Sequence, residues 1–394
     1  MKQRTMAGLF AFVLAAGPAV SLLAADGVIK LGISSSTTGA LANVGASTKN
    51  AAEMAKQEIN AANAGKGLPI GDKFYTVELV YVDNKSDRST ATANAFTLIS
   101  RDQVMAIVGP QSSDRAVAVG GVANAYGTPM ITPWSTVPLT TLNRPFVFRM
   151  PATLDNQPMA TVKFAAKEWK ATKAAVLYDA ISPYPSTMAK AFKDAFEKVN
   201  GPGSVVAFEA FPTHATDFSK QLQAIINSGA DFLYTPQHYN EVPLIVHQAR
   251  KMGWKKPITG TNSWAAGDMI GQCGAECKEL YFTGNFAPGG TDGKARVFVD
   301  NYQKNYKQMP DEVAALTYDA MHLLAESLKN MSSLSGNLVE DRTKLRDRIA
   351  ATKRFEGVTG IIGFHGTGDP PKCIVLIKFG ENDVLTVHDK VCPE

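Results

Sequence analysis

Short apolar runs alternate with helix-like segments from Asp26 onwards, and this alternation constrains the fold more than any other feature. Runs rich in β-branched residues, which are typical of strands, occupy 28–33, 75–82, 104–108 and 129–132. Between them lie segments with apolar residues at helical spacing, the first of which we expect to run to about Ala62 with Ser47 as its cap. Strands that alternate with helices build a parallel, doubly wound sheet, so we predict an α/β fold.

A second series of the same kind follows Arg149, which indicates a second lobe like the first. Its predicted strands are 174–178, 205–211, 231–235 and 257–260. Three helices then follow one another at 296–306, 311–329 and 342–352, before two final strands. Because helices without intervening strands cannot build a third parallel sheet, we expect them to pack on an existing lobe.

The length of 394 residues suits two to three domains with a sizeable core. The 40 basic and 36 acidic residues are dispersed, without a long run of one sign. We therefore expect no nucleic-acid partner.

The first 25 residues predict export. Lys2 and Arg4 precede an apolar stretch over 6–23, and small residues follow up to Ala25. This order is typical of a secretory signal peptide, residues 1–25, and places the mature protein in the periplasm. The alternative is a membrane anchor, for which the stretch is marginal in length and interrupted at Pro18.

The cysteines indicate disulfides, because an even number in an exported chain favours pairing. Of the three possible connectivities we favour the two local pairs, Cys273–Cys277 and Cys373–Cys392. A zinc site is the alternative, but the CxxxC spacing has no second close cysteine pair and the six histidines are scattered. We expect neither a metal nor a cofactor.

Catalytic signatures such as G-x-S-x-G, HExxH, GxGxxG after a strand or a Walker loop do not occur. The acidic pair Asp311 and Glu312 is typical of a solvated helix start. An enzyme would have to use Ser113 with His238 from the opposite lobe as nucleophile and base. We therefore expect a protein that is not an enzyme.

Small hydroxyl residues gather where predicted strands end, at 34–38, 112–113 and 132–136. In a doubly wound sheet these loops share one edge, where ligands bind. Helix-start N–H groups together with serine hydroxyls make a cradle for a carboxylate. For any single residue, helix capping is the alternative explanation.

With these loops the chain resembles the periplasmic substrate-binding proteins of branched-chain amino-acid ABC transporters, which have the type I periplasmic binding fold. The similar segments are IKLGISSSTTGALANVGASTKNAAEMAKQEINA at 29–62, IVGPQSSDRAVAV at 107–119, GTPMITPWSTVPLT at 127–140, DFLYTPQHYNEVPLIVHQARKMGW at 231–254 and TYDA at 317–320. The resemblance implies two lobes that close over a ligand and are joined by three crossovers. It places lobe 1 at 26–148 and 287–356, and lobe 2 at 149–286 and 357–394.

The resemblance also implies a ligand site. Ser113 matches the serine that holds the ligand carboxylate, Trp134 the position whose carbonyl accepts from the ligand amine, and Thr136 the threonine at the same head group. The Trp134 ring could face the ligand or the lobe core. Tyr184 matches a tyrosine that covers the ligand, with His238 or Tyr239 next to it. The remaining expected ligand-binding residues are Gln111, Ser112, Ser135, Asn262 and Asp319.

Asn262 departs from the family pattern, because it stands where the amine-binding glutamate is expected. A buried ammonium normally requires a carboxylate partner. The ligand is then an amide, a urea-like compound or a simple carboxylate, unless Asp114, Asp319 or Glu241 supplies the missing charge. A surface position on its helix is the alternative for Asp319.

The resulting hypothesis is an exported solute-binding component of an ABC importer. It would act as a monomer, capture a small amino acid or related polar metabolite by hinge closure, and deliver it to a membrane permease with a cytoplasmic ATPase. The alternative is the ligand-binding ectodomain of a sensor or receptor for an amide, a urea-like compound or an aromatic carboxylate.

Overall fold

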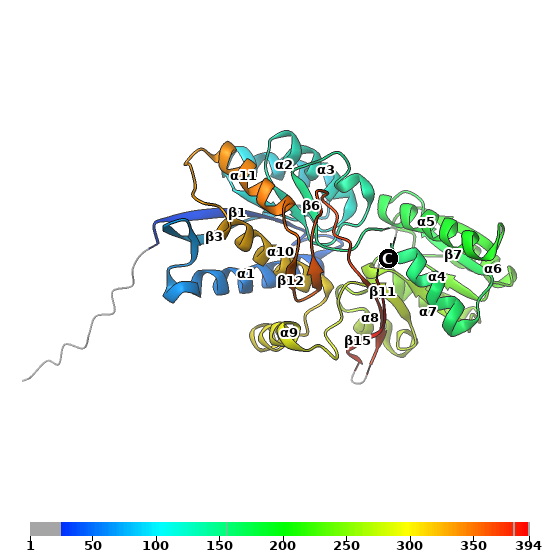
Figure 1. The fold of residues 1–394 in the computed structure, drawn as a ribbon. Helices are drawn as coiled ribbons and strands as arrows, with labels where there is room; N and C mark the ends of the chain where they lie inside the picture. Colours follow the sequence, from blue (N-terminus) through cyan, green and yellow to red (C-terminus); the bar gives the residue numbers. More distant parts are fainter. Residues whose placement is uncertain (1–24, 155, 381–382, 393–394) are drawn as a thin grey trace, which may run out of the picture.

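The computed structural model describes residues 25–394, apart from 155, 381–382 and 393–394. The predicted signal peptide, except for Ala25, lies outside the described residues. In the described part, six strands form one sheet in the order β2-β3-β1-β4-β5-β6, and seven form another in the order β15-β14-β11-β10-β9-β7-β8. Figure 1 shows the two sheets, each with its own helices, as neighbouring halves of the molecule.

The first sheet is parallel except for β2, which pairs antiparallel with β3. Its strands are β1 (Gly27–Ser35), β2 (Leu68–Ile70), β3 (Lys73–Asp83), β4 (Ala106–Val108), β5 (Met130–Thr132) and β6 (Val147–Arg149). Its helices are α1 (Ala42–Gly65), α2 (Arg88–Phe96), α3 (Ser113–Ala125), α10 (Glu312–Lys329) and α11 (Leu338–Ala350). Helices α1 and α10 share one hydrophobic core with β1, whereas α2 and α3 share another with β4 and β5. We call this sheet with its helices the first lobe.

The second sheet has five parallel strands and an antiparallel pair at one side. Its strands are β7 (Ala174–Asp179), β8 (Val205–Phe211), β9 (Phe232–Tyr234), β10 (Ile258–Gly260), β11 (Tyr281–Gly284), β14 (Ile374–Phe379) and β15 (Leu385–Val391). Its helices are α4 (Asn156–Trp169), α5 (Pro183–Asn200), α6 (Ser219–Asn227), α7 (Val242–Lys251) and α8 (Met269–Cys273). We call this sheet with its helices the second lobe.

Helix α9 (Gly293–Tyr306) packs against α1 and α10 of the first lobe, and the small hairpin of β12 (Phe355–Gly357) and β13 (Gly360–Ile362) contributes Phe355 and Ile362 to the core of that lobe. The expectation that the late helices pack on an existing lobe is confirmed, because Val313 and Leu316 of α10 belong to the core of the first lobe. In Figure 1, α10 lies beside α1. The predicted domain boundaries stay a prediction. Ile362 and Phe364, which lie in the segment predicted for lobe 2, belong to the hydrophobic core of the first lobe.

The doubly wound α/β prediction is confirmed, but the predicted cap of the first helix is wrong. Helix α1 begins at Ala42, so that Ser47 lies inside it and is buried. The Ser47 hydroxyl instead donates to Asp311 Oδ2 at 2.7 Å, far along the sequence. The short strand β2 was not expected from the sequence.

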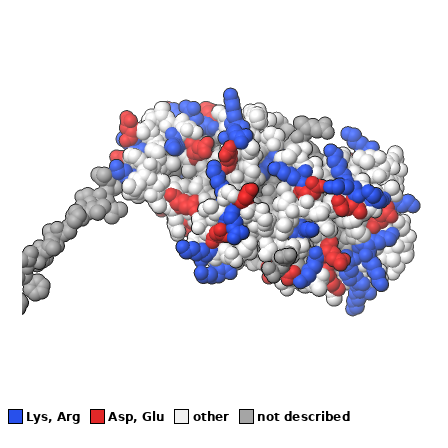
Figure 2. Space-filling model, turned by 60° about the horizontal axis from the view of Figure 1, so that its bottom comes forward, with Lys and Arg blue, Asp and Glu red and all other residues white. Residues whose placement is uncertain are grey.

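Both favoured cysteine pairs are found as disulfides, Cys273–Cys277 and Cys373–Cys392. A search of the described helices finds none with the length and apolar character needed to cross a membrane. Basic and acidic side chains are intermingled on the face seen in Figure 2, in agreement with the small net charge of +4.

Candidate functional site

A small cavity with about 10 Å³ of free space lies between the lobes, where parallel strands of both sheets end. Its lining residues are Gln111, Ser112, Ser113, Trp134, Tyr184, His238, Asn262 and Ser263. The first lobe contributes those that follow β4 and β5, and the second lobe those at the start of α5 and after β9 and β10. In parallel α/β sheets this edge is the usual place for a ligand.

The first helical residue of α3, Ser113, stands in the cavity wall. The N–H groups of a first helical turn have no partner within the helix and carry a partial positive charge. Ser135 Oγ donates to Ser113 Oγ at 3.0 Å, so that the Ser113 hydroxyl hydrogen is free to point elsewhere. This arrangement can hold an anionic oxygen.

Three rings form the opposite part of the wall. The His238 ring lies 5.8 Å from the Trp134 ring and stacks on the Tyr184 ring at 5.4 Å, between centroids. Trp134 lines the cavity and also belongs to the hydrophobic core of the first lobe, so it takes part in both surroundings. A planar or apolar ligand body can pack against such rings.

Several buried polar atoms of this wall have no hydrogen-bond partner among the described residues. They are both amide atoms of Gln111, Trp134 Nε1 and His238 Nδ1. Buried polar atoms are nearly always paired in folded proteins, because an unpaired one costs about 1–3 kcal/mol. These atoms are available for hydrogen bonds to a ligand in the cavity.

The lining side chains are uncharged at neutral pH. Burial, together with the charge of Arg115, lowers the pKa of His238 to about 4, so its ring is neutral. Burial also raises the pKa of Tyr184 well above its usual value. The remaining lining residues are amides, serines and a tryptophan, so this wall offers hydrogen bonds without a full charge.

Asn262 has both ends of its amide in use. Its Nδ2 donates to Glu312 Oε1 at 3.0 Å, and its Oδ1 accepts from the Tyr184 hydroxyl at 3.0 Å. Glu312 is only 1% exposed, so the expectation of a solvated helix start is wrong for this residue. Burial raises the pKa of Glu312 to about 7, although the two N–H groups of Asn285 and the Asn262 amide oppose this shift.

The three carboxylates that we considered as ammonium partners do not line this cavity. Asp114 accepts from Ser112 Oγ at 2.5 Å and forms an ion pair with Arg115 at 3.5 Å. The surface alternative for Asp319 is wrong, because Asp319 is 1% exposed and accepts from the N–H groups of Val358 and Thr359. Its role is to hold the turn between β12 and β13.

Three other predicted site residues also lie outside the lining. Ser135 stands behind Ser113, and Thr136 is buried with its hydroxyl unpartnered among the described residues. Tyr239 packs in the core of the first lobe. Ser263 does line the cavity and was not predicted, although it follows strand β10 directly after Asn262, which is the signal that identified the other loops.

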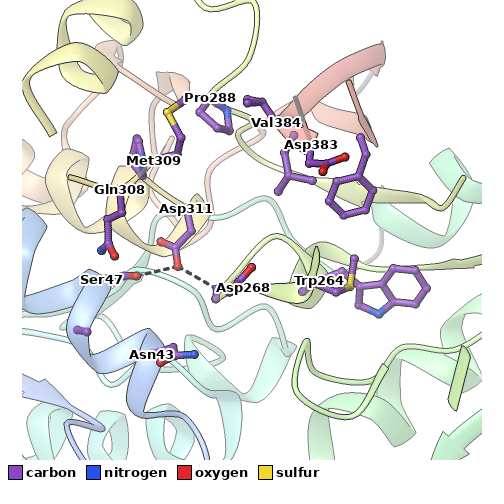
Figure 3. Close-up of a pocket in the computed structure, with 16 residues that line it drawn as sticks. Asn43, Ser47, Trp264, Asp268, Pro288, Gln308, Met309, Asp311, Asp383 and Val384 are labelled. Atoms are coloured by element: carbon purple, nitrogen blue, oxygen red, sulfur yellow. Dashed lines mark hydrogen bonds between the residues drawn. The ribbon is translucent and has the colours of Figure 1, made fainter. Parts of the chain in front are cut away.

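A larger groove, about 570 Å³, lies nearby between the start of α1 and the turn from β14 to β15. In Figure 3, Asp311 stands in its wall, with dashed lines to Ser47 and to the segment that carries Asp268. Its Asp311 and Ser47 side chains are already paired with each other, whereas Gln111 and His238 of the smaller cavity keep polar atoms without a described partner. We therefore take the smaller cavity as the candidate ligand site.

Among the described residues no cluster of histidine, cysteine, aspartate and glutamate is arranged to hold a metal ion. The cavity also brings Ser113 and His238 to one wall. Among the described residues, however, no hydrogen bond joins them: Ser113 Oγ accepts from Ser135, and His238 Nδ1 has no described partner.

Comparison of the sequence with known proteins assigns the chain to a family. A family model described as "Periplasmic binding protein" matches residues 28–380. A leucine-, isoleucine-, valine-, threonine- and alanine-binding protein from Pseudomonas aeruginosa is 26% identical over 373 residues, covering 94% of each chain. These are solute-binding proteins and not enzymes.

Solved structures of similar fold are also solute-binding proteins. A leucine-binding protein from Thermotoga maritima superimposes with a TM-score of 0.82 at 26% identity, covering 93% of this chain and 99% of that one. A branched-chain amino acid transporter substrate-binding protein from Streptococcus pneumoniae, in complex with isoleucine, gives a TM-score of 0.81 at 29% identity with the same coverage.

Proposed function

The chain belongs to the periplasmic binding protein family, and we propose that it is the solute-binding component of an ABC importer for a small carboxylate-bearing metabolite. The observation that carries this proposal is the start of α3. There a helix N-terminus, the Ser113 hydroxyl and the unpartnered, buried amide of Gln111 meet in one enclosed cavity. This combination suits a carboxylate oxygen.

The position of the cavity supports capture by hinge closure. Its wall is made by both lobes, so a ligand inside it would contact the two at once and favour the closed arrangement. The closed protein would then present the ligand to a membrane permease that is driven by a cytoplasmic ATPase. We expect the exported protein to act as a monomer in the periplasm.

The chemistry of the wall favours a ligand without a free ammonium group. An ammonium taken from water into a buried site needs a negative partner. The lining has none, and Glu312 behind it is already engaged by Asn262 and Asn285. An amide or an aromatic carboxylate fits better, because its neutral body can pack against Trp134 and the rings beside it.

The second candidate ligand is an α-amino acid, which the similarity to the amino-acid-binding relative favours. The free space in the cavity is about 10 Å³, far below the usual 300–1000 Å³ of ligand pockets, so the walls must move apart to admit either ligand. If the ligand is an α-amino acid, backbone carbonyl groups such as that of Trp134 would have to accept hydrogen bonds from its ammonium group without help from a carboxylate.

Matched ligand pairs test the proposal. The purified protein is heated with L-leucine or 4-methylpentanoate, and with L-phenylalanine or 3-phenylpropanoate, so that each pair differs only in the amino group. Benzoate and benzamide complete the panel. A ligand that binds the folded protein raises the melting temperature, by an amount that corresponds to about 2.7 kcal/mol at a hundredfold excess over Kd.

We expect the acids without an amino group to raise the melting temperature more than their partners. A rise with the amino acids alone would overturn the ligand preference and leave the importer function standing. If no compound in a wider panel of carboxylates, amides and amino acids raises it, the solute-binding proposal itself would lose its support.

A further inference from the structure

One loop of the second lobe forms part of the cavity wall and is also held by the first lobe. Residues 261–267 follow strand β10, and Asn262 and Ser263 of this loop line the cavity. The Ala265 carbonyl accepts from the Glu312 backbone N–H at 3.0 Å, and the Gly267 N–H donates to Asp311 Oδ2 at 3.1 Å. Together with the bond from Asn262 to Glu312, three hydrogen bonds therefore join this loop to the start of α10.

The start of α10 is anchored in the first lobe. Asp311 caps the helix by accepting from the Ala314 N–H at 2.8 Å through Oδ1. Its other oxygen, Oδ2, accepts both from Ser47 of α1 and from the Gly267 N–H. One carboxylate thus connects two helices of the first lobe with a loop of the second, as Figure 3 shows for Ser47 and Asp311.

The loop is shaped for this contact. Gly267 has a φ of +64°, in the left-handed region, and a Cβ added there would lie 2.3 Å from the Tyr239 ring. Only glycine fits such a position without displacement of the ring. The backbone N–H that reaches Asp311 is therefore presented by a residue that the packing itself requires.

Glu312 connects the same loop with the segments between the lobes. Its Oε2 accepts from the Asn285 N–H at 2.6 Å, and Asn285 Oδ1 in turn accepts from the Ala152 N–H at 2.8 Å. Asn285 directly follows β11, and Ala152 lies between β6 and α4. The carboxylate therefore contacts the cavity wall on one side and two inter-lobe segments on the other.

We propose that Asp311 and Glu312 form a latch, which holds loop 261–267 and its cavity-lining Asn262 against the first lobe when the lobes are closed. Asp311 and Glu312 are positioning residues, because they act through the loop and neither of them lines the cavity. The inference rests on the proposed hinge closure, but it makes no use of the identity of the ligand. When the lobes separate, the three hydrogen bonds to the loop break and water reaches both carboxylates.

The latch is coupled to protons. In the closed arrangement burial raises the pKa of Glu312 to about 7 and raises the pKa of Asp311 as well. The titratable groups that face Glu312 are Tyr184 from α5, Lys372 from the segment before β14, and Asp311 beside it on α10. Exposure to water in the open arrangement would return the pKa of Glu312 towards its ordinary value of 4.5.

The sign of the coupling follows from linkage. A carboxyl group whose pKa is higher in the closed state binds its proton more tightly there. Its contribution to closure is fully present below the ordinary pKa of 4.5 and is lost as the pH rises through about 7. Acidification from pH 8.5 to pH 5.5 should therefore favour closure through Glu312, on the order of tenfold in the closed-to-open ratio. His238, whose pKa is lowered to about 4 by burial in the cavity, acts in the opposite direction, because it takes up a proton more readily when the lobes are open.

Small-angle X-ray scattering of the purified protein without added ligand measures this shift through the radius of gyration. Glu312→Gln should remove the contribution of this carboxyl group, because the side chain no longer titrates, so that acid closes the variant less than the wild type. The control Glu340→Gln changes an exposed glutamate in the first turn of another helix, α11, and should follow the wild type. Ser47→Ala keeps every carboxylate and weakens only the anchor of Asp311, so it should favour the open form while retaining the pH dependence.

One result would overturn the latch: a Glu312→Gln variant whose radius of gyration changes with pH in the same way as that of the wild type. If Glu312→Gln does not fold, Ser47→Ala decides, because a variant as closed as the wild type contradicts the latch. Since no ligand is added, failure of the ligand panel would leave this test unaffected.

Discussion

Ser113 places several attractions for an anion at one point. It starts α3, so the unpaired N–H groups and the positive end of the helix dipole lie beside its hydroxyl. Because Ser135 donates to the Ser113 oxygen, the Ser113 hydroxyl can donate its own hydrogen bond to a ligand. Behind Ser135, Thr140 Oγ1 lies 2.7 Å from its hydroxyl, so this short chain of hydroxyls is ordered before a ligand arrives.

We expect Ser113→Ala to weaken binding of the best ligand from the panel by about 1–3 kcal/mol, the usual cost of leaving a buried polar partner unpaired. Isothermal titration calorimetry measures the change. Ser89→Ala is the matched control, because Ser89 also lies in a first helical turn, that of α2, but is exposed. Equal affinity in wild type and Ser113→Ala would mean that the carboxylate lies elsewhere.

Asn262 illustrates what can be learned from a single position. The sequence marks it as a departure from the family pattern, and it does line the cavity. The sequence does not show that Glu312, fifty residues further along, stands directly behind it. A glutamate next to an aspartate at a helix start has the pattern of a solvated surface, and only its three-dimensional neighbours bury it.

At the scale of elements, the C-terminal hairpin of β14 and β15 extends the second sheet on its antiparallel side. Strand β15 is the edge strand, and edge strands have unpaired backbone groups that fray or pair wrongly. The disulfide Cys373–Cys392 joins the residue before β14 to the residue after β15, so it closes the open end of the hairpin.

The two disulfides should differ in their contribution to stability. In the chain-entropy account, closing a loop stabilises more when the loop is longer, and the sequence separations are 19 and 4 residues. We expect replacement of Cys373 and Cys392 by serine to lower the free energy of unfolding by about 3 kcal/mol, and replacement of Cys273 and Cys277 by about 2 kcal/mol. Urea titrations of both double variants would show the order; a larger loss for the short loop would contradict it.

At the scale of the whole molecule, the segments between the lobes meet around a buried cation. Lys372 Nζ donates to Thr359 Oγ1 at 2.5 Å, and the Thr359 hydroxyl donates to Asp319. Burial lowers the pKa of Lys372 to about 8, while the charges of Asp319 and Glu312 oppose this shift. The charge of Lys372 therefore offsets two buried carboxyl groups that belong to the first lobe.

Lys372→Met should lower the free energy of unfolding at pH 7 by about 3–5 kcal/mol, the typical cost of removing one partner from a buried ion pair. The pKa values of Asp319 and Glu312 are raised, so more of these groups are protonated and neutral at pH 5. The loss should therefore be smaller at pH 5 than at pH 7. Urea unfolding at both pH values measures it, and the exposed Lys344→Met should change little.

An equal loss for Lys372→Met at both pH values would show that packing of the lysine stem, and not its charge, is what matters. A destabilisation by Lys344→Met of the same size would point to a general effect of charge removal.

Much of the molecule follows from short-range pattern. The alternation of strand-like and helix-like segments determined the doubly wound fold, and polar residues directly after strands identified Gln111, Ser112 and Ser113 in the cavity wall. Close spacing in the chain likewise indicated the two disulfides. These features are local or repeat with the period of an element, so the sequence by itself determined them.

The tertiary structure alone decided which polar groups meet across the lobes. Ser47 and Asp311 lie 264 residues apart, and Asn262 and Glu312 lie 50 apart, and no periodicity relates such positions. Their burial, and hence the raised pKa of Glu312, depends on neighbours brought together by the fold. The physical reason is that desolvation is a property of the assembled surroundings, whereas strand and helix patterns are properties of the chain itself.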